Sequence, residues 1–549
     1  MKKYVFPAVS ILCILVGFII GNALSNKVNA QRIYIQNGQL MMTQSSKADQ
    51  LLQLLRQSYV DSLDVDSITD IVLEEFVKQL DPHSSYIPKK DIELVNSELS
   101  GSFSGIGVQF TIQNDTVNIV AVISGGPSER VGVLAGDKIV TVNDTTFVGK
   151  GTTNERVMHT LRGPKGTEVR IGIVRAGTPE ILNYTITRGD IPVHSVDASF
   201  IIEPKVESRK TANAQSPKIG FVRVNKFGET TYREFINALA ELRAQGATEY
   251  IVDLRENSGG YLDQAVKMAN EFLQAGDLIV YSEGRSYPRY EARANGGGRF
   301  KDVKLVVLID NFSASASEIF AGAMQDNDRA TIIGRRSFGK GLVQQQFPFI
   351  DGSALRLTVA RYYTPSGRCI QKPYTLGDNE SYQQDLIERY DHGEFYSADS
   401  IHFADTTTYR TKRGRIVYGG GGIMPDIFVG RDTTQYSPYF NIVSNRAYTY
   451  QFAYRYADSH RKELSKFTRW QDLEKHLLAA NWLPEFVKFC QDKGVEPNEK
   501  ELAKSRALLI RVVNGYIVRD IMGDKGFFPL FERDDDITKR AIDTLTGKE

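Results

Sequence analysis

The chain has 549 residues, which is too long for one compact core, so several domains are expected. Lys and Arg together number 67 and Asp and Glu number 66, which gives a net charge of +1. This balance argues against a nucleic-acid-binding protein and against a polybasic protein of the membrane surface.

The first thirty residues are typical of a targeting segment. Two lysines follow Met1, and residues 5–24 are almost wholly apolar. An uncleaved membrane anchor is favoured by the length of this run, whereas Val28-Asn29-Ala30 resembles the cleavage site of a signal peptide. Both alternatives place the remainder in the extracytoplasmic envelope (the periplasm). There it is either anchored to the inner membrane or released after cleavage.

Neither a cofactor nor a metal site is expected. The seven histidines are scattered, without the spacing of a zinc motif. Beyond residue 30, Cys369 and Cys490 form no Cys-x-x-Cys pair and no disulfide framework. Stability must therefore come from packed cores.

Residues 31–97 are predicted to form an N-terminal helical segment, of which residues 46–97 pack on the domain that follows residue 189. Apolar residues recur at helical spacing from residue 46 to residue 80, where Asp81-Pro82 ends the pattern. His83 follows in a turn. We expect a structural role for it, because nothing nearby in sequence forms a nucleophile–base pair.

Residues 98–189 change to short alternating strands separated by glycines, with one short helix at about residues 153–161. The N–H groups of a glycine loop can cradle a carboxylate, and the strand that follows can pair with a peptide. This stretch resembles a PDZ domain, which implies that it binds peptides; the alternative is a β-rich packing domain without a ligand. The expected groove residues are Gly105, Ile106, Gly107, Val108, Val157 and Leu161.

Residues 190–437 alternate strands with helices, which predicts an α/β domain. Gly259-Gly260 follows a predicted strand. The pair is either a simple turn or a source of backbone N–H groups at a reaction centre. Residues 280–300 and 373–418 are polar and rich in tyrosine, so they are predicted to be surface insertions. Residues 438–549 are predicted to form a C-terminal helical domain.

Residues 304–346 carry the pattern that points most directly to chemistry. An apolar strand is followed by three alternating serines and a helix, which exposes a small hydroxyl at a helix N-terminus. Lys340 is bracketed by glycines and has no carboxylate in its immediate sequence. A serine and an apolar lysine suggest a Ser/Lys hydrolase. The alternative is an exposed lysine in a glycine-rich turn.

Six motifs in order resemble the carboxyl-terminal processing peptidases, also called tail-specific proteases. They are Leu80-Asp81-Pro82-His83-Ser84, Asp253 to Gly260, Ser313 to Ala323, Ser337 to Gln345, Tyr362 to Arg368, and Gly422 to Asp426. The resemblance covers residues 46–430. It implies an α/β Ser/Lys peptidase core with an inserted β-rich PDZ domain and helical segments at both ends.

The resemblance also assigns roles. It implies Ser315 as nucleophile, Lys340 as general base and Gln344 as the residue that orients Lys340. The oxyanion donors would be the N–H of Ala316 and of either Gly259 or Gly260. In a straight strand Lys340 and Gln344 would lie about 13 Å apart. We therefore expect the chain to bend near Gly341.

The expected function is a serine endopeptidase of the cell envelope that acts through an acyl-enzyme. Its PDZ domain would capture protein substrates with apolar C-terminal tails. The alternative is a non-catalytic PDZ scaffold or binding protein on the same fold. The C-terminal helices are candidates for homo-oligomer formation, for adaptor binding or for simple packing onto the core.

Overall fold

The structure is a computed structural model in which two compact units, Met1–Val77 and Lys78–Glu549, are distinguished. The predicted targeting segment, residues 1–30, lies outside the described residues. Among those that are described, no helix has the length and apolar character needed to cross a membrane. The described residues are 33–36, 39–42, 47–97, 99–113, 115–123, 125–134, 136–175, 178–204, 217–402 and 406–548.

The first unit contains a small antiparallel pair and two helices. Strand β1 (Ile33–Gln36) pairs with β2 (Gln39–Met42), and helices α2 (Lys47–Ser58) and α3 (Val65–Val77) follow. The helices expected between residues 46 and 80 are therefore present.

In the second unit, the β-rich domain is built around one antiparallel sheet with the strand order β10-β9-β7-β6-β5. Its core is made of apolar residues on alternate strand positions, such as Val117, Ile119 and Ile171. Strand β5 lies at an edge, so one side of it is open to a further strand. The elements are β4 (Ser102–Gly105), β5 (Val108–Gln113), β6 (Thr116–Val122), α5 (Pro127–Arg130), β7 (Lys138–Val142), β8 (Thr145–Thr146), α6 (Asn154–Leu161), β9 (Glu168–Val174), β10 (Leu182–Thr187) and β11 (Gly189–Pro192), which pairs with β4.

The α/β domain contains a sheet with the strand order β12-β13-β14-β17-β18-β23, parallel except for β12. The predicted strands and helices occur within a few residues of their expected places. The strands are β12 (Val196–Ile202), β13 (Lys218–Val224), β14 (Ala247–Asp253), β17 (Lys304–Ile309), β18 (Thr331–Gly334) and β23 (Ile427–Phe428), and the helices are α7 (Thr231–Ala244), α8 (Leu262–Asn270) and α9 (Ala316–Asp326).

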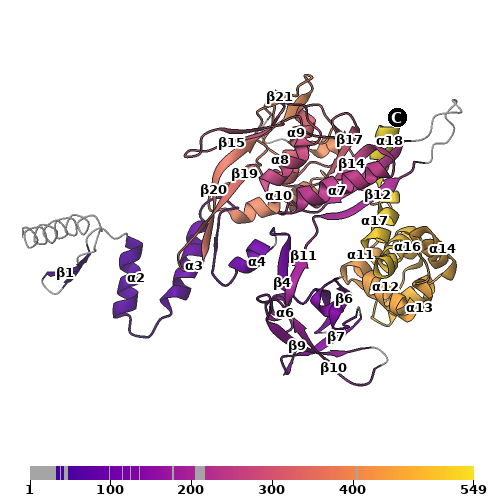
Figure 1. The fold of residues 1–549 in the computed structure, drawn as a ribbon, viewed down its shortest axis with the longest axis horizontal. Coiled ribbons are helices and arrows are strands. Elements are labelled where there is room, and N and C mark those ends of the chain that lie inside the picture. Colours follow the sequence, from indigo (N-terminus) through magenta and orange to yellow (C-terminus); the bar gives the residue numbers. More distant parts are fainter. Residues whose placement is uncertain are drawn as a thin grey trace, which may run out of the picture. The chain divides into compact units, whose positions relative to one another are not determined.

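Both faces of this sheet are covered by helices (Figure 1). Val252 and Val307 pack towards α7, α8 and α9, whereas Ile251 and Leu308, one residue away on the same strands, face the opposite side. Helix α18 (Asp536–Thr546) covers that opposite side. Residues 438–549 are helical, and of their helices α18 packs on the α/β sheet, because its apolar stripe completes the core on that side.

A second sheet, with the order β16-β15-β20-β19, corrects the prediction that residues 280–300 are a surface insertion. Val280, Ala292 and Phe300 are buried in the main core because the polar residues of these strands occupy only the outward face. The strands are β15 (Leu278–Glu283), β16 (Tyr290–Arg293), β19 (Leu342–Pro348) and β20 (Ala354–Tyr363), to which β3 (Ser85–Ile87) adds.

Residues 373–418 are likewise not a simple surface insertion. They contain α10 (Asn379–Asp391), a short 3₁₀ turn (Ala398–Ser400) and the hairpin β21 (Thr408–Arg410) and β22 (Ile416–Tyr418). Arg389 is buried, and its guanidinium donates to Glu394 and to the backbone carbonyl of Ser337. This polar region was misassigned because a few buried aromatic side chains, such as Tyr382 and Phe395, and buried ion pairs between distant residues fix it to the core.

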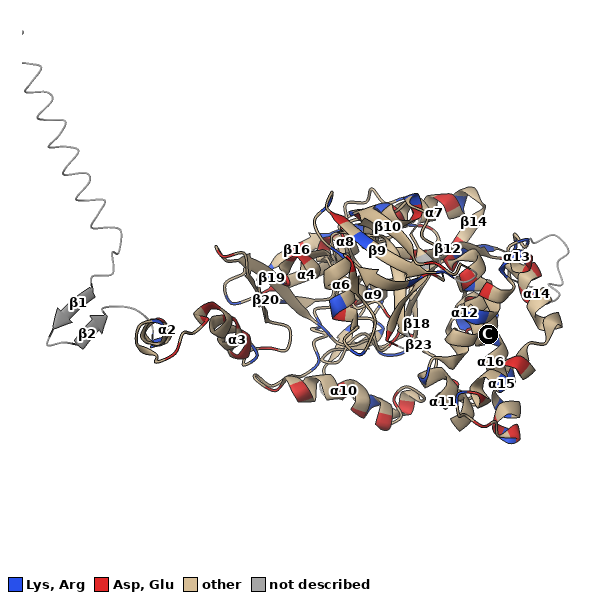
Figure 2. Ribbon diagram, turned by 90° about the horizontal axis from the view of Figure 1, so that it is seen from below, with Lys and Arg blue, Asp and Glu red and all other residues tan. Residues whose placement is uncertain are grey.

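The remaining C-terminal helices enclose a core of their own around Trp482 and Phe486. Figure 2 shows basic and acidic residues on the same helices, for example on α10, as the near-zero net charge implies. The C-terminal helices are α11 (Pro438–Asn445), α12 (Tyr448–Ser459), α13 (Arg461–Leu464), α14 (Trp470–Ala480), α15 (Leu483–Gln491), α16 (Glu499–Met522) and α17 (Asp524–Arg533). One further helix, α4 (Ile92–Ser97), precedes the β-rich domain.

Candidate active site

The three serines between β17 and α9 have different surroundings. Ser313 and Ser317 are fully buried, and their hydroxyls donate to the backbone carbonyls of Leu254 at 2.8 Å and Asn257 at 2.9 Å. Ser315 is partly exposed and sits at the start of α9 with φ of 55°. Such a backbone conformation is strained for a non-glycine residue, and residues of this kind gather at active sites.

Two buried side chains hold the loops of Ser315 and Lys340 together. The Glu318 carboxylate accepts the backbone N–H of Ser315 at 2.8 Å and that of Lys340 at 2.9 Å. The Tyr362 hydroxyl donates to the backbone carbonyl of Ser315 at 3.0 Å and contacts that of Lys340. Two residues twenty-five positions apart in sequence are thus fixed in one place.

Glu318 has further donors around it. Its carboxylate also accepts the Ser337 hydroxyl at 2.5 Å and the Gly339 N–H at 2.7 Å. Burial raises the pKa of Glu318 to about 7, although these donors favour its ionised form.

The surroundings of Lys340 favour a neutral amine. Burial lowers the pKa of Lys340, and the positive charge of Arg356 lowers it further. The idea that no carboxylate lies near Lys340 holds only along the sequence, because in space Glu318 and Asp81 both act to raise its pKa. The net direction is nevertheless downward, which a general base requires. Nζ of Lys340 makes no hydrogen bond with any residue that the structure describes.

His83 lies closer to this site than its sequence neighbours suggested. Its Nε2 is 2.9 Å from the Tyr382 hydroxyl, and the two rings meet edge to face. Burial, followed by the charge of Lys340, lowers the pKa of His83 to about 4. His83 is therefore a neutral neighbour of Lys340.

Gly259, the first residue of the glycine pair, lies directly against the loop of Ser315. A Cβ on Gly259 would stand 2.6 Å from Cβ of Ser315 and 3.0 Å from the Ala316 nitrogen, and the φ of Gly259 is +102°. A glycine is required here on both grounds. The Gly259 N–H donates to Oδ1 of Asn257 at 2.9 Å, so it is already engaged.

In the glycine pair and at the residue after Ser315, two N–H groups remain free of hydrogen bonds within the described part of the chain, those of Gly260 and Ala316. Ala316 is the first residue of α9, where backbone N–H groups have no intrahelical partner. Of the two glycines that sequence left open, Gly260 is thus the one with an available donor.

Gln344 does not contact Lys340 through a hydrogen bond. Its Nε2 donates to Oγ1 of Thr358 at 3.2 Å, and Thr358 in turn donates to Asp81 at 2.8 Å. Lys340 precedes β19, and the pairing of β19 with β20 is irregular between Val343 and Gln344. The role of Gln344 in orienting Lys340 stays a prediction.

The residues predicted for the peptide groove are mostly buried. Val157 and Leu161 expose at most 4% of their surface within the core of the β-rich domain, and Ile106 exposes 3%. Gly105 and Gly107 lie at the end of β4 and just before the edge strand β5, which starts at Val108. The edge suits strand addition, whereas the buried side chains offer little surface, so their role stays a prediction.

Sequence reasoning missed Glu318 and Tyr362. The spacing Ser315-Ala316-Ser317-Glu318 is a capping-box signature at a helix start, and it could have revealed Glu318. No local pattern marks Tyr362, which reaches the site from a different sheet.

Comparison with known proteins adds three family matches and several relatives. The profiles of Peptidase family S41, the PDZ domain and a family of unknown function (DUF8443) match residues 218–380, 104–186 and 439–523. The carboxy-terminal-processing protease of Bartonella bacilliformis is 37% identical over 352 residues, which cover 63% of this chain and 76% of that protein. A probable CtpA-like serine protease of Staphylococcus aureus is 33% identical, over 62% and 66% of the two chains.

A solved structure of a photosystem II D1 C-terminal processing protease aligns with 71% of this chain and 88% of its own, at 24% identity and a TM-score of 0.38.

Proposed function

Because the chain belongs to the carboxy-terminal-processing protease family, within peptidase family S41, we propose that it cleaves peptide bonds with a Ser315–Lys340 dyad through an acyl-enzyme. Membership makes it a serine peptidase with a PDZ domain. One observation carries the assignment of the nucleophile. The hydroxyls of Ser313 and Ser317 donate to buried backbone carbonyls. Ser315 is partly exposed, and its loop is held next to that of Lys340, whose amine is desolvated.

The mechanism follows from these groups. Neutral Lys340 takes the proton of the Ser315 hydroxyl as Oγ attacks the scissile carbonyl carbon. The oxygen of that carbonyl becomes an oxyanion and is held by the N–H groups of Ala316 and Gly260. Protonated Lys340 then gives its proton to the departing amine, which leaves an acyl ester on Ser315. Water, activated by Lys340, hydrolyses the ester.

We propose that the PDZ domain selects substrates by adding an apolar C-terminal tail to the free edge of β5. Main-chain pairing would supply affinity, and the Gly105–Gly107 turn would receive the carboxylate. Amidation of the substrate tail is expected to raise KM without a matching fall in kcat, because it removes only the captured charge.

The decisive experiment compares turnover of an unfolded protein with an apolar tail by the wild type, Ser315→Ala and Lys340→Ala. We expect Ser315→Ala to fall to the level of the blank and Lys340→Ala to lose about 10²–10⁴-fold in kcat. The wild type is incubated with a slowly hydrolysed ester substrate and the reaction is then quenched. Mass spectrometry should find the acyl group on Ser315. Equal turnover by all three proteins would overturn the dyad and favour a binding protein.

We propose an extracytoplasmic location for the catalytic domains, on the basis of the apolar segment at residues 5–24. Protease added to intact spheroplasts should degrade these domains. Protection of the catalytic domains from that protease would contradict the location.

A further inference from the structure

The loop that carries the oxyanion glycines is tied to the last two helices by a buried arginine. Arg255 follows β14 and is 7% exposed. Its guanidinium donates to Glu532 at 2.7 Å, to Asp535 at 2.7 Å and to Asp253 at 2.8 Å. Glu532 lies on α17, and Asp535 is the residue that caps α18.

The residues that follow Arg255 in this loop are hydrogen-bonded to the segment that carries Ser315. Two residues after Arg255, Asn257 accepts the Gly259 N–H through its side chain, and its backbone carbonyl accepts the Ala314 N–H at 3.0 Å. Between them, Glu256 has a φ of 61°, and its N–H donates to Asp310 at 3.0 Å. A strained backbone of this kind persists only where its surroundings hold it.

We propose that Glu532 and Asp535 are positioning residues for peptide hydrolysis, which hold Arg255 and through it the loop that places the Gly260 N–H beside Ser315. The inference rests on the proposed function of Ser315. It assigns to α17 and α18 a part in catalysis, although neither helix contributes a group that touches the substrate.

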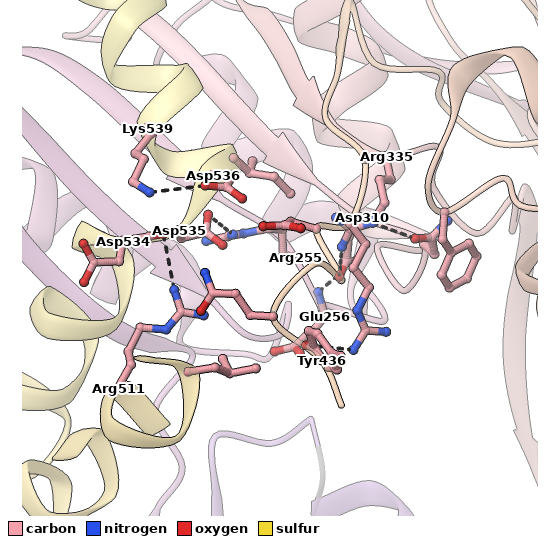
Figure 3. Close-up of a pocket in the computed structure, with 18 of the residues that line it drawn as sticks. Arg255, Glu256, Asp310, Arg335, Tyr436, Arg511, Asp534, Asp535, Asp536 and Lys539 are labelled. Atoms are coloured by element: carbon pink, nitrogen blue, oxygen red, sulfur yellow. Dashed lines mark hydrogen bonds and ion pairs between the residues drawn. The ribbon is translucent and has the colours of Figure 1, made fainter. Parts of the chain in front are cut away.

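Figure 3 shows Arg255 and Asp535 among the side chains that line a pocket. Arg255 and Asp535 lie on the wall of a cavity of about 620 Å³, lined by both the α/β domain and the C-terminal helices. Asp535 is 32% exposed at its side chain, whereas Glu532 is 7% exposed. Of the two ion pairs that Arg255 makes with the C-terminal helices, the pair with Asp535 therefore faces solvent, and the pair with Glu532 is buried.

Asp535→Asn is the variant of choice. Asp535 accepts the Thr538 N–H at 2.8 Å as the cap of α18, and asparagine caps helices equally well. The substitution removes the charge opposite Arg255 and keeps the cap. The control is Glu474→Gln, which breaks the ion pair of Glu474 with Arg533 on the same helix α17 but does not involve Arg255.

Full-length proteins would be compared for kcat, KM and melting temperature on a tailed, unfolded substrate. We expect Asp535→Asn to lower kcat about tenfold, as a displaced oxyanion donor would, with KM within about twofold of the wild type. Glu474→Gln should match the wild type in kcat. If Asp535→Asn and Glu474→Gln have equal kcat values, the inference is overturned.

A peptide boronic acid supplies a second readout, because its tetrahedral adduct with Ser315 needs the oxyanion donors. Its affinity should fall in Asp535→Asn by the same factor as kcat, and the Kd of an uncleaved peptide, measured in the Ser315→Ala background, should not change. If Asp535→Asn binds the boronate as tightly as the wild type does, the inference about Glu532 and Asp535 is rejected, and the proposed role of Ser315 is not affected. Failure of the wild type to bind the boronate rejects the proposed nucleophile instead.

Glu532→Gln tests the closed pair of Arg255. We expect a larger loss of kcat than in Asp535→Asn. Arg255 then keeps only Asp253 and the partly exposed Asp535 as charged partners, and loses its buried partner on α17. A variant that folds with wild-type kcat would contradict the inference.

Discussion

Ser315 and Lys340 share one carboxylate, because Glu318 accepts the backbone N–H of Ser315 at 2.8 Å and that of Lys340 at 2.9 Å. The other oxygen of the same carboxylate accepts the Ser337 hydroxyl and the Gly339 N–H, so four donors depend on Glu318. Glutamine has nearly the same shape, but its amide nitrogen cannot accept a hydrogen bond.

Glu318→Gln should therefore leave buried donors unsatisfied. We expect the free energy of unfolding to fall by about 2–3 kcal/mol, and kcat to fall because the backbone next to Ser315 and Lys340 loses part of its support. Urea denaturation and steady-state kinetics measure the two effects. Glu241→Gln, an exposed glutamate on α7, serves as the control; a Glu318→Gln protein as stable as this control would contradict the expectation.

The charges around Lys340 should move the acid limb of the activity profile in opposite directions. Arg356 lowers the pKa of Lys340 and Asp81 raises it. If Lys340 is the base, only its neutral form is active, so Arg356→Gln should shift the limb of kcat/KM to higher pH and Asp81→Asn should shift it to lower pH. Profiles measured over pH 5–10 check both signs. A shift of both variants in the same direction would argue against Lys340 as the base.

The approach of Gly259 to Ser315 can be separated from its backbone conformation. Gly259→Ala places a Cβ 2.6 Å from Cβ of Ser315, whereas Gly246→Ala, at a similar φ of +95°, meets only Cδ of Lys218 at 3.5 Å. Gly246→Ala should lose about 1–2 kcal/mol of stability from its positive φ, and Gly259→Ala should lose more because its Cβ also clashes with neighbouring atoms. Only Gly259→Ala should lose kcat, by about 10²–10³-fold. Comparable kcat values in the two variants would show that the close approach of Gly259 to Ser315 has no part in catalysis.

His83 should make the protein less stable in mild acid. Its pKa is lowered from 6.5 to about 4, so between these values the unfolded chain binds more protons than the folded one. The stability it contributes is complete above pH 6.5 and is lost as the pH falls, by about 2 kcal/mol between pH 7 and pH 5. Denaturation of the wild type and of His83→Asn at both pH values isolates this effect, since the other titrating groups are common to both proteins. The same pH dependence in both would place His83 in solvent.

Gln344 is held with its amide nitrogen on Thr358, which leaves its carbonyl oxygen as an acceptor for Lys340. If it orients the lysine, Gln344→Ala should lower kcat about tenfold or more, and Gln344→Glu should shift the acid limb to higher pH by favouring the protonated amine. Thr358→Val tests the support of Gln344 and should give a smaller loss. Wild-type kcat and pH profile in Gln344→Glu would leave Gln344 a purely structural residue.

The strands and helices that frame the site could be predicted because their apolar runs and periodicities are local. The run at Lys304–Ile309 and the glycine pair at 259–260 are examples. The choice among Ser313, Ser315 and Ser317 was not local, since it depends on which hydroxyls meet the backbone carbonyls of the loop that follows β14, 59 and 60 residues earlier. The resemblance, not the pattern, singled out Ser315.

The errors have the same physical origin. Residues 280–300 appeared polar because a half-buried strand shows its outward residues in sequence as clearly as its inward ones, and Arg293 is exposed while its neighbour Ala292 is buried. An amphipathic pattern in α18 predicts that one face is covered but not what covers it. The contact of Arg255 with Glu532 likewise joins segments that no sequence period relates.

The cover that α18 provides sets an order of events during synthesis. Ser315, Lys340 and the strands beneath them leave the ribosome long before α18 does. Until then Phe221, Val306 and Leu308 form an apolar sheet face with no partner layer. Because domains fold as units, the catalytic layer is completed only after α18 emerges. We therefore expect the nascent chain to lack peptidase activity, and its apolar sheet face to stay exposed, until α18 has emerged.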